Sequence, residues 1–441
     1  MLEIPGILDG TVSRRRLLQG GGCAALASWL NQSLRAREET SPIRSCILLM
    51  LYGGPSQLET WDMKPDAPRE IRGEYLPIRT NTPGRRVSEH LPHCAKILDR
   101  LAVVRSMTHT INNHSSAMYQ AMVGRAPVKD MPVIGIDRTQ DFPNYASTLT
   151  YLSAGRGPLP AVALPHVMKN VVDLPGQNAG FLGGAYDPMQ IVGNPNQPNF
   201  RVRNLQTAIG KARVNERMNL RNSLASDTGI RANDVDQYQQ RAHELLNSQS
   251  VSGAFDLKRE SSKSRERYGR SKLGQSLLMA RRLVESGVRF VNVHDGITNG
   301  NATNWDSHNR LFPRHRELLP PFDQGFSALI EDLEVRGLLD STLVIAMGEF
   351  GRTPRINRNA GRDHWPNCYS LVMAGGGVVG GAVHGESDKF AALPESDPVS
   401  PGDIAATVFW RFGLDPRREI VDPLGRPFPI ATGQPVKAIF S

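Results

Sequence analysis

Short apolar runs that end in glycine or in polar residues recur along the chain. They lie at 46–54, 101–106, 161–165, 288–296, 341–351 and 370–377. A continuous apolar run of this length between turn residues is typical of a strand covered on both faces. Helical spacing appears between them, for instance at 322–339, closed by Gly337, and at 401–414, which begins at Pro401. The alternation predicts an α/β fold of three layers, in which helices cover both faces of a largely parallel sheet.

Residues from about 200 to 285 have a different pattern. They are charged and helical in period, and they lack strand signals. We interpret this stretch as a helical cap inserted into an α/β domain of residues 41–441. A solvated helical hairpin without a function is the alternative.

The N-terminal stretch SRRRLLQGGGCAALASWLNQSLRA, residues 13–36, resembles a twin-arginine export signal. Residues 1–40 are therefore expected to be a signal peptide and linker, read by the twin-arginine translocase, and the mature protein to be periplasmic or extracellular. A basic amphipathic first helix is the alternative reading. The apolar run is too short for a stable membrane span, and Cys23 sits in a poor lipobox, so a lipid anchor is left open.

Composition and charge add two constraints. The formal net charge is +9 and falls to about +7 if cleavage occurs near Ala36, which suits anionic substrates but is also common on solvated surfaces. The basic residues are scattered and no basic patch is interleaved with aromatic residues, so nucleic acid is not an expected partner. Cys46, Cys94 and Cys368 are too widely spaced for a disulfide framework or a zinc knuckle.

Polar residues follow several of the predicted strands, and ligands of such sheets bind at the carboxyl ends of strands. The run 341–351 delivers Glu349, with Arg352 beside it, although Glu349 could instead cap a helix or pair with Arg352. The next loop, GRDHWP, contributes Asp363 and His364, which are ligand types for Zn²⁺ or Mn²⁺.

The run 288–296 ends at His294 and Asp295 and leads to the segment NWDSHN. Asp306 and His308 are two residues apart, so in an extended segment their side chains point the same way and can bind one ion. This pair is a weak motif by itself. It gains weight because three strand ends now supply carboxylates or imidazoles.

The segment MTHTINNHSSAMYQAMVG, residues 107–124, joins a predicted strand to a helix beginning near Ser115. A hydroxyl there would lie just before a helix N-terminus, which favours an anion. A threonine hydroxyl beside a metal loses its proton readily enough to attack phosphorus or sulfur. The alternative is a helix capped by Asn113 or His114, with loop histidines that only pack.

The first strand ends in GGPSQLETWDMKP, where Gly53 and Gly54 permit close approach of the backbone. Glu59, Asp62 and Lys64 follow. Either acid could be a metal ligand or a surface carboxylate.

Taken together, these motifs resemble the exported bacterial "domain of unknown function 1501" family, within the alkaline phosphatase and sulfatase superfamily. The resemblance covers nearly the whole chain, including GEFGRTP, GAVHGESD and DIAATVFWRFGLDP. Enzymes of that superfamily bind two metals between strand ends, and a Thr, a Ser or a modified Cys attacks the ester. In the phosphodiesterase branch the nucleophile segment resembles T-K-T-F-P-N-H before a helix ending in T-G, and THTINNH with MVG is similar to it.

The resemblance implies specific roles. The nucleophile is Thr110, and Asn113 is an oxyanion contact. Asp306, His308 and His364 are ligands of one metal, and Glu349 is a ligand of the second. His114, Asp295 and Asp363 are secondary candidates.

Two departures from the superfamily pattern concern the second metal. Glu349, Phe350 and Gly351 stand where D-H-G is usual, and Gly53 and Gly54 stand where an Asp ligand is customary. Either Asp62 substitutes as a ligand, or the second site is weak or absent. No Cys lies in the C-x-P-x-R context that common sulfatases need.

The leading hypothesis is an exported metal-dependent hydrolase of phosphate or sulfate esters, in which Thr110 attacks and Arg352 helps to hold the anionic group. The cofactor is expected to be one or two divalent ions, Zn²⁺ or Mn²⁺ first and Ca²⁺ or Mg²⁺ as alternatives. A non-catalytic relative acting in binding or envelope assembly is the second hypothesis. An exopolysaccharide-modifying transferase is the third.

Overall fold

The computed structural model describes residues 42–128, 135–152, 159–202, 248–296 and 304–441, together with positions 213, 216 and 220. The predicted signal peptide and Cys23 lie outside the described residues, as does most of the middle of the predicted cap. Among the helices of the described residues, none is both long enough and apolar enough to cross a bilayer.

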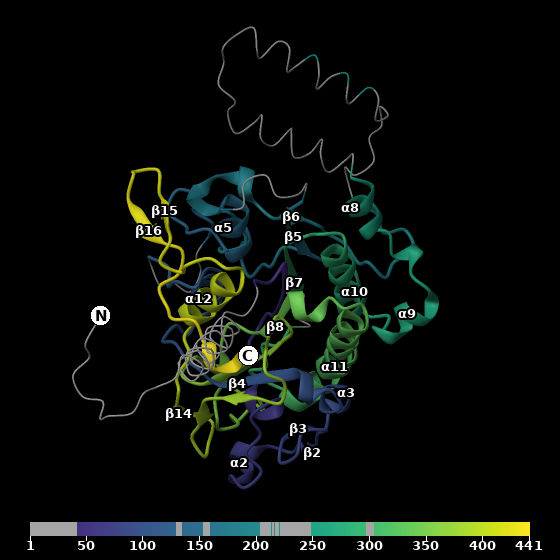
Figure 1. The fold of residues 1–441 in the computed structure, drawn as a ribbon. Helices are drawn as coiled ribbons and strands as arrows, with labels where there is room; N and C mark the ends of the chain where they lie inside the picture. Colours follow the sequence, from purple (N-terminus) through teal and green to yellow (C-terminus); the bar gives the residue numbers. More distant parts are fainter. Residues whose placement is uncertain are drawn as a thin grey trace, which may run out of the picture. The chain divides into compact units, whose positions relative to one another are not determined.

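An eight-stranded sheet forms the centre of the domain (Figure 1). Its spatial order is β12 (Val383–His384), β4 (Leu101–Met107), β11 (Tyr369–Ala374), β8 (Thr342–Met347), β1 (Ser45–Leu51), β7 (Phe290–Asp295), β5 (Ala161–Leu164) and β6 (Met189–Gln190). All neighbouring strands run parallel except β11, which is antiparallel to both β4 and β8. The largely parallel sheet and the six predicted strands are confirmed.

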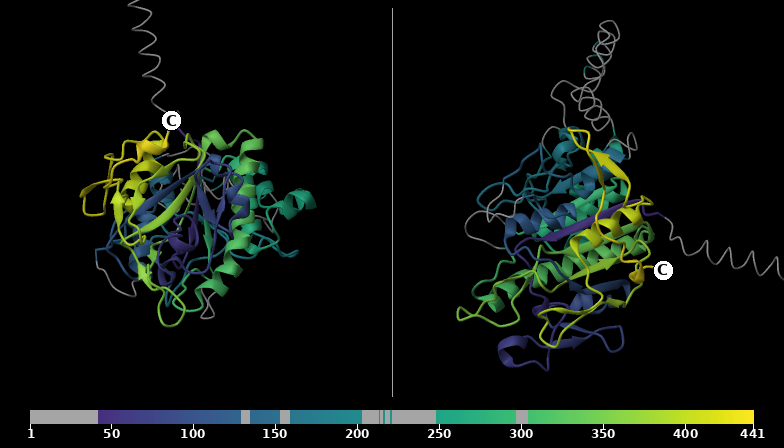
Figure 2. Two further views of the ribbon diagram at one scale, coloured as in Figure 1. Left: turned by 90° about the horizontal axis from the view of Figure 1, so that it is seen from below. Right: turned by 90° about the vertical axis from the view of Figure 1, so that its left-hand side faces the viewer.

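Helices cover both faces of this sheet. On one side lie α3 (Pro92–Ala95), α10 (Lys272–Glu285) and α11 (Leu311–Val335); on the other lie α4 (His114–Val123), α5 (Tyr145–Leu152) and α12 (Pro401–Arg411). Figures 1 and 2 show these layers with the sheet between them. Alternate residues of β1 enter the two apolar cores, which explains why the strand is apolar from Cys46 to Leu51. The predicted three-layer α/β architecture is confirmed.

Shorter elements complete the described chain. Four two-stranded sheets pair β2 (Pro77–Arg79) with β3 (Arg86–Ser88), β9 (Gly351–Arg352) with β10 (His364–Trp365), β13 (Glu386–Ser387) with β14 (Pro394–Ser396), and β15 (Glu419–Val421) with β16 (Pro427–Pro429). The short helices are α2 (Arg69–Arg72), α8 (Gln249–Ala254) and α9 (Ser262–Arg267), with 3₁₀ turns η1 (Gln57–Glu59), η2 (Leu98–Arg100), η3 (Gly180–Leu182), η4 (Gly184–Tyr186), η5 (Leu257–Arg259), η6 (Leu339–Ser341) and η7 (Lys437–Ile439).

The last helix of the predicted cap lies in the core. Leu277, Leu278 and Leu283 of α10 are fully buried and belong to the same apolar cluster as β7 and α11. The helices α8 and α9 precede it, and residues 203–247 lie outside the described part except for three positions. The helical period of 200–285 therefore includes a core helix.

Parallel register brings the chain segments after β1, β7 and β8 to one edge of the sheet. Leu51 lies beside Asp295, and Met50 lies beside Met347. Gly53 follows β1 with a φ of 110°, and a Cβ on it would lie 2.4 Å from the backbone nitrogen of Asp306. The glycine is thus required where the loop carrying Asp306 crosses the end of β1.

Candidate metal centre

Asp306 lies at the centre of the polar cluster at this edge. Its Oδ2 is 3.3 Å from His114 Nε2, and its Oδ1 is 3.2 Å from His308 Nε2 and 3.5 Å from His364 Nε2. Arg352 Nη2 donates to the same Oδ1 at 2.7 Å. Segments that are distant in sequence, namely the start of α4, the 304–308 loop and β10, therefore converge on one carboxylate.

Each imidazole has its Nδ1 bound to an oxygen. His114 Nδ1 lies 2.7 Å from Glu349 Oε1, His308 Nδ1 lies 2.7 Å from Asp363 Oδ1, and His364 Nδ1 lies 3.1 Å from the carbonyl of Asn112. These oxygens accept hydrogen bonds, so each Nδ1 carries the proton. A neutral ring then presents its Nε2 lone pair to the cluster, as metal-ligating histidines do. His308 Nε2 lies 2.9 Å from His364 Nε2, so without a metal one of these two nitrogens carries a proton and donates it to the other.

Three of these groups could hold one ion. His114, Asp306 and His364 offer ligand atoms that all lie within 4.8 Å of one another, and no other such group occurs among the described residues. Two imidazoles and a carboxylate fit Zn²⁺ or Mn²⁺ by ligand type. The sequence had put His308 in this set and His114 among the secondary candidates. His308 is 42% exposed and bridges Asp363 to the cluster.

Glu349 lies behind His114. It is fully buried, and its two oxygens accept the backbone N–H of Gly53 at 3.0 and 3.1 Å in addition to the bond with His114. The predicted role of Glu349 was to bind a second ion. In the structure, the carboxylate orients His114 and fixes the turn after β1.

The charges in this cluster perturb one another. Burial by itself would lower the pKa of His114, but its hydrogen bonds to Asp306 and Glu349 outweigh burial and raise that pKa to about 9. Burial would raise the pKa of Asp306, but His114, His364 and Arg352 hold it far below its usual range. Burial lowers the pKa of His364. Without a metal, the cluster therefore keeps a proton on His114 and an ionised carboxylate on Asp306.

Arg352 is fully buried. Besides Asp306, its guanidinium donates to the carbonyls of Gly54 at 2.9 Å, of Arg362 at 3.1 Å and of Gly53. The sequence had suggested that Arg352 holds an anionic group of the substrate. In the structure its donors point into the protein, and a single charge-assisted hydrogen bond from Nη2 holds Oδ1 of Asp306.

The loop that carries Thr110 is attached to the cluster on both sides of that residue. His109 Nε2 donates to the carbonyl of Glu349 at 2.7 Å, and the carbonyl of Asn112 accepts from His364. Thr110 itself is exposed, and its hydroxyl has no hydrogen bond to any residue in the described ranges. Asn113 caps α4 by accepting from the backbone N–H of Ser116 at 2.9 Å, as the capping alternative predicted.

Three further candidates lie in separate interactions. Asp62 is buried, accepts from Ser387 Oγ, and forms ion pairs with Lys64 and Arg105. Asp295 accepts from Trp305 Nε1 at 3.0 Å and thereby supports the residue preceding Asp306. Glu59 forms a buried ion pair with Arg362. Asp62 and Glu59 are thus paired with cationic side chains of the protein. At position 53, where the superfamily pattern has an Asp ligand, a side chain would clash with the backbone of Asp306.

Comparison with solved structures finds proteins with low sequence identity. Ps i-CgsB in complex with k-i-k-neocarrahexaose is 12% identical with a TM-score of 0.41, over 85% of this chain and 72% of the other. The PsFucS1 sulfatase from Pseudoalteromonas sp. is 14% identical with a TM-score of 0.39, over 87% and 70%. The phosphonate monoester hydrolase SpPMH from Silicibacter pomeroyi is 10% identical with a TM-score of 0.38, over 90% and 76%.

Comparison of the sequence with curated proteins finds no match. A family model does match, and it covers residues 43–440, which is nearly the whole chain and includes every residue of the cluster around Asp306. The chain therefore belongs to the family described as "Protein of unknown function (DUF1501)".

Proposed function

We propose that the protein is a metal-dependent hydrolase of phosphate or sulfate esters with Thr110 as its nucleophile. The observation that carries the proposal is the set of imidazoles whose Nδ1 atoms are anchored on oxygens while their Nε2 atoms face Asp306. A structural cluster does not need this common orientation, whereas a metal site does. His114, Asp306 and His364 would hold one divalent ion.

When bound, the ion would supply Lewis-acid stabilisation of negative charge on the ester oxygens and on the hydroxyl that attacks. The protein's own residues would supply the nucleophile and bind the anionic group of the substrate. Thr110 is exposed, and its loop is held through His109 and Asn112, so little ordering is needed before its hydroxyl attacks the phosphorus or sulfur of the ester. In that step the bond to the ester's alcohol breaks and the alcohol leaves with the threonine proton. Water then releases the phosphate or sulfate from Thr110. Asn113 sets the start of α4, whose backbone N–H groups and dipole favour the anionic group of the substrate.

Glu349 and Arg352 are positioning residues in this proposal. Glu349 holds the Nδ1 proton of His114, and Arg352 holds one oxygen of Asp306. A second ion is not required by this arrangement, since the oxygens of Glu349 accept from Gly53 and His114.

We also propose export by the twin-arginine pathway, with the mature protein acting in the periplasm or outside the cell. The support is the sequence of residues 13–36, which resembles such a signal. A reporter fused to residues 1–40 tests it. Export should stop when Arg14 and Arg15 are both replaced by Lys, and export that continues would refute it.

The test of the hydrolase combines metal analysis with a substitution of the nucleophile. The full chain, purified without chelator, is assayed on bis-p-nitrophenyl phosphate, p-nitrophenyl phosphate and p-nitrophenyl sulfate beside Thr110→Ala and Thr110→Ser. We expect about one equivalent of metal in all three proteins, loss of turnover in the alanine variant and partial turnover in the serine variant. Full activity of Thr110→Ala on every hydrolysed ester would overturn the nucleophile, and no metal after reloading with Zn²⁺ or Mn²⁺ would favour a non-catalytic relative.

A further inference from the structure

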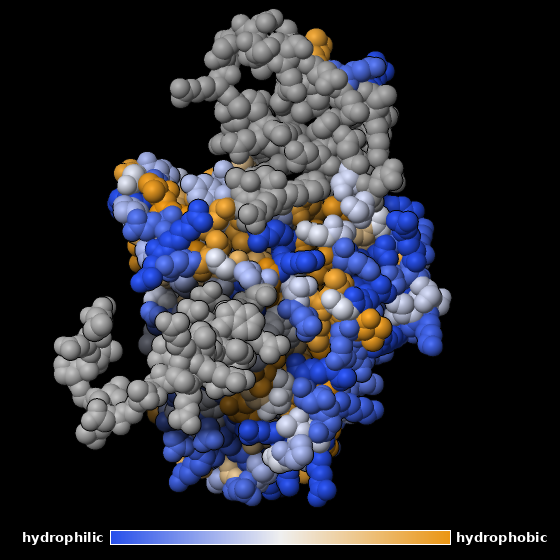
Figure 3. Space-filling view, in the orientation of Figure 1, coloured by the Kyte–Doolittle hydropathy of each residue, from blue (hydrophilic) through white to orange (hydrophobic). Residues whose placement is uncertain are grey.

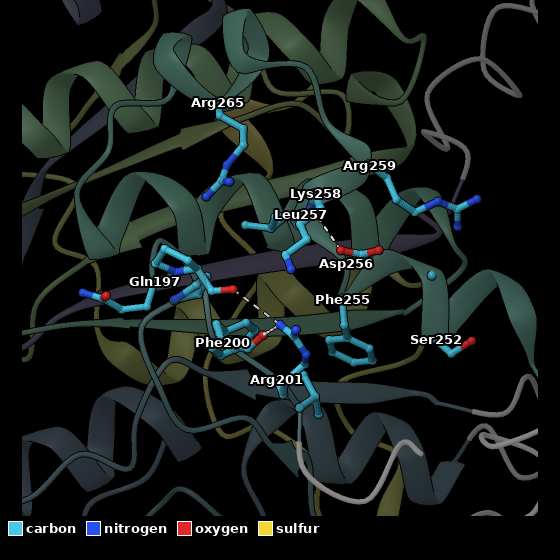
Figure 4. A pocket seen from close by; sticks show the side chains of 14 residues that line it. Gln197, Phe200, Arg201, Ser252, Phe255, Asp256, Leu257, Lys258, Arg259 and Arg265 are labelled. Atoms are coloured by element: carbon cyan, nitrogen blue, oxygen red, sulfur yellow. Dashed lines mark hydrogen bonds between the residues drawn. The ribbon is translucent and has the colours of Figure 1, made fainter. Parts of the chain in front are cut away.

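A pocket lies between the 195–202 loop and the α8–η5–α9 segment, and none of its lining residues belongs to the cluster around Asp306. Its volume is about 650 Å³, which is in the range of small-molecule sites. Figure 4 shows Lys258 and Arg265 reaching into this space from one side and Arg201 from the other. Phe200 and Phe255 supply apolar surface beside them.

The cations that line this pocket have no acidic partner among the described residues. Arg201, Lys258, Arg259 and Arg265 line it, and none of the four forms an ion pair with an acid in the described part of the chain. Asp256 is the one carboxylate among the lining residues, and it accepts from the backbone N–H of Lys258 at 3.1 Å, capping η5. The pocket therefore carries an excess of positive charge.

Arginines just outside the pocket, in contrast, are paired with acids. In and just after α9, Arg267 pairs with Glu331 and Arg270 pairs with Glu266. On α10, Arg281 and Arg282 share Glu260. The surface over α9 is hydrophilic (Figure 3). The arginines outside the pocket pair with acids, whereas those that line the pocket form no such pair within the described residues.

The hydrogen bonds of the pocket arginines also leave their positive charge unneutralised. Arg201 Nη1 donates to the carbonyl of Phe200 at 2.8 Å, and Arg265 Nε donates to Gln275 at 2.7 Å. Neutral acceptors fix these guanidinium groups without cancelling their charge. Burial and the charge of Arg270 lower the pKa of Arg265, and the nearby charge of Glu266 offsets them only in part.

We propose that this pocket binds an organic ligand that carries two or more phosphate or sulfate groups on a ring-shaped or apolar scaffold. The oxyanions would pair with Arg201, Lys258 and Arg265, since guanidinium and ammonium groups bind such groups through charge-assisted hydrogen bonds. The scaffold would pack on Phe200 and Phe255. This site is separate from the proposed catalytic centre and does not depend on its activity.

The test is a calorimetric titration of the full chain with a heparin tetrasaccharide and with inositol hexakisphosphate, which supply sulfate and phosphate groups. An unsulfated disaccharide and inorganic sulfate are the controls for scaffold and for charge alone. The variants are Lys258→Gln and Arg201→Gln, with Arg267→Gln as a matched control that removes one paired charge from α9 outside the pocket.

We expect one or both polyanions to bind, each pocket variant to weaken binding by about five- to tenfold, and Arg267→Gln to change it by less than about twofold. Binding should persist in Thr110→Ala and after metal chelation, which separates this proposal from the hydrolase. Failure of both polyanions to bind would overturn it. An equal loss of affinity in Arg267→Gln would also overturn it, because it would show attraction to net charge alone.

Discussion

Two acids in the loops after β1 and β7, the buried Glu59 and the partly buried Asp306, have different kinds of partner. Asp306 is surrounded by three imidazoles and one guanidinium. Glu59 lies in a closed pair with Arg362, whose Nη2 is 2.6 Å from Oε1 and whose Nε is 3.1 Å from Oε2. Both acids follow a strand, and both neighbourhoods are polar.

The difference is in the partners. Arginine has five donors, no acceptor and a charge that it keeps at all physiological pH values, so its pair with Glu59 leaves nothing for a ligand. Histidine has a lone pair on one nitrogen when the other is protonated, and its charge can change near neutral pH. The carboxylate with imidazole partners can therefore hold a metal, while the carboxylate with an arginine partner stabilises the fold. Four predictions test this contrast.

The largest effect is expected for His364→Ala. It removes one of the three ligand atoms that lie within 4.8 Å of one another, so the bound metal should be lost and ester turnover should fall by at least about a thousandfold. The free energy of unfolding of the metal-free protein should change by no more than about 1 kcal/mol. Elemental analysis and chemical denaturation measure both. Retained metal would contradict the ligand set.

Arg362→Met should lower the stability of the fold and leave metal binding unchanged. It leaves Glu59 buried without its partner, which is expected to cost about 3–5 kcal/mol in the free energy of unfolding. The fraction that stays folded should keep its metal, because Arg362 does not contact the imidazoles through its side chain. Urea denaturation with metal analysis of the folded fraction tests it. The double variant Glu59→Gln, Arg362→Met is the control and should recover part of the loss.

The free energy of unfolding of the metal-free protein should depend on pH because His114 binds a proton in the folded state. Its pKa is about 9 in the folded protein and about 6.5 in an unfolded chain. Because the folded value is the higher one, this stabilisation is complete below about pH 6.5 and is lost as the pH rises through about 9, by at most about 3 kcal/mol.

Denaturation in the presence of a chelator at several pH values measures this loss. His114→Gln should flatten the profile, and saturating Zn²⁺ should remove the fall because the metal takes the place of the proton. A fall that is the same in His114→Gln as in the unaltered chain would contradict the assignment.

The smallest effect is expected for His308→Gln. His308 contacts Asp306 and His364 from the exposed rim, so its loss should weaken metal binding by about tenfold or less without a measurable change in stability. A metal titration followed by competition with a chelator gives the affinity. A loss of affinity as large as that of His364→Ala would contradict this ligand set. It would mean that His308, as the sequence indicated, binds the metal in place of His114.

Much of the fold could be predicted from the sequence. The six apolar runs became six strands of one sheet, because a strand covered on both faces is predominantly apolar, although β7 also buries Asn292 and His294. The predicted helix at 322–339 is longer in the structure: α11 begins at Leu311 and runs through Pro320 and Pro321. Proline is a strong breaker signal, but the burial of Leu319 and Phe322 outweighs it here.

The sequence also determined which segments would supply the site, since THTINNH, NWDSH, GEFGR and GRDHW each follow or flank a buried strand. Only the tertiary structure decided how these residues contact one another. His114, Asp306 and His364 are the three whose ligand atoms lie within 4.8 Å of one another, Arg352 donates to backbone carbonyls and to Asp306, and Glu349 accepts from Gly53 and His114. The physical reason is that ligand geometry depends on which strand ends become neighbours and on hydrogen bonds between residues hundreds of positions apart, and local spacing does not encode either.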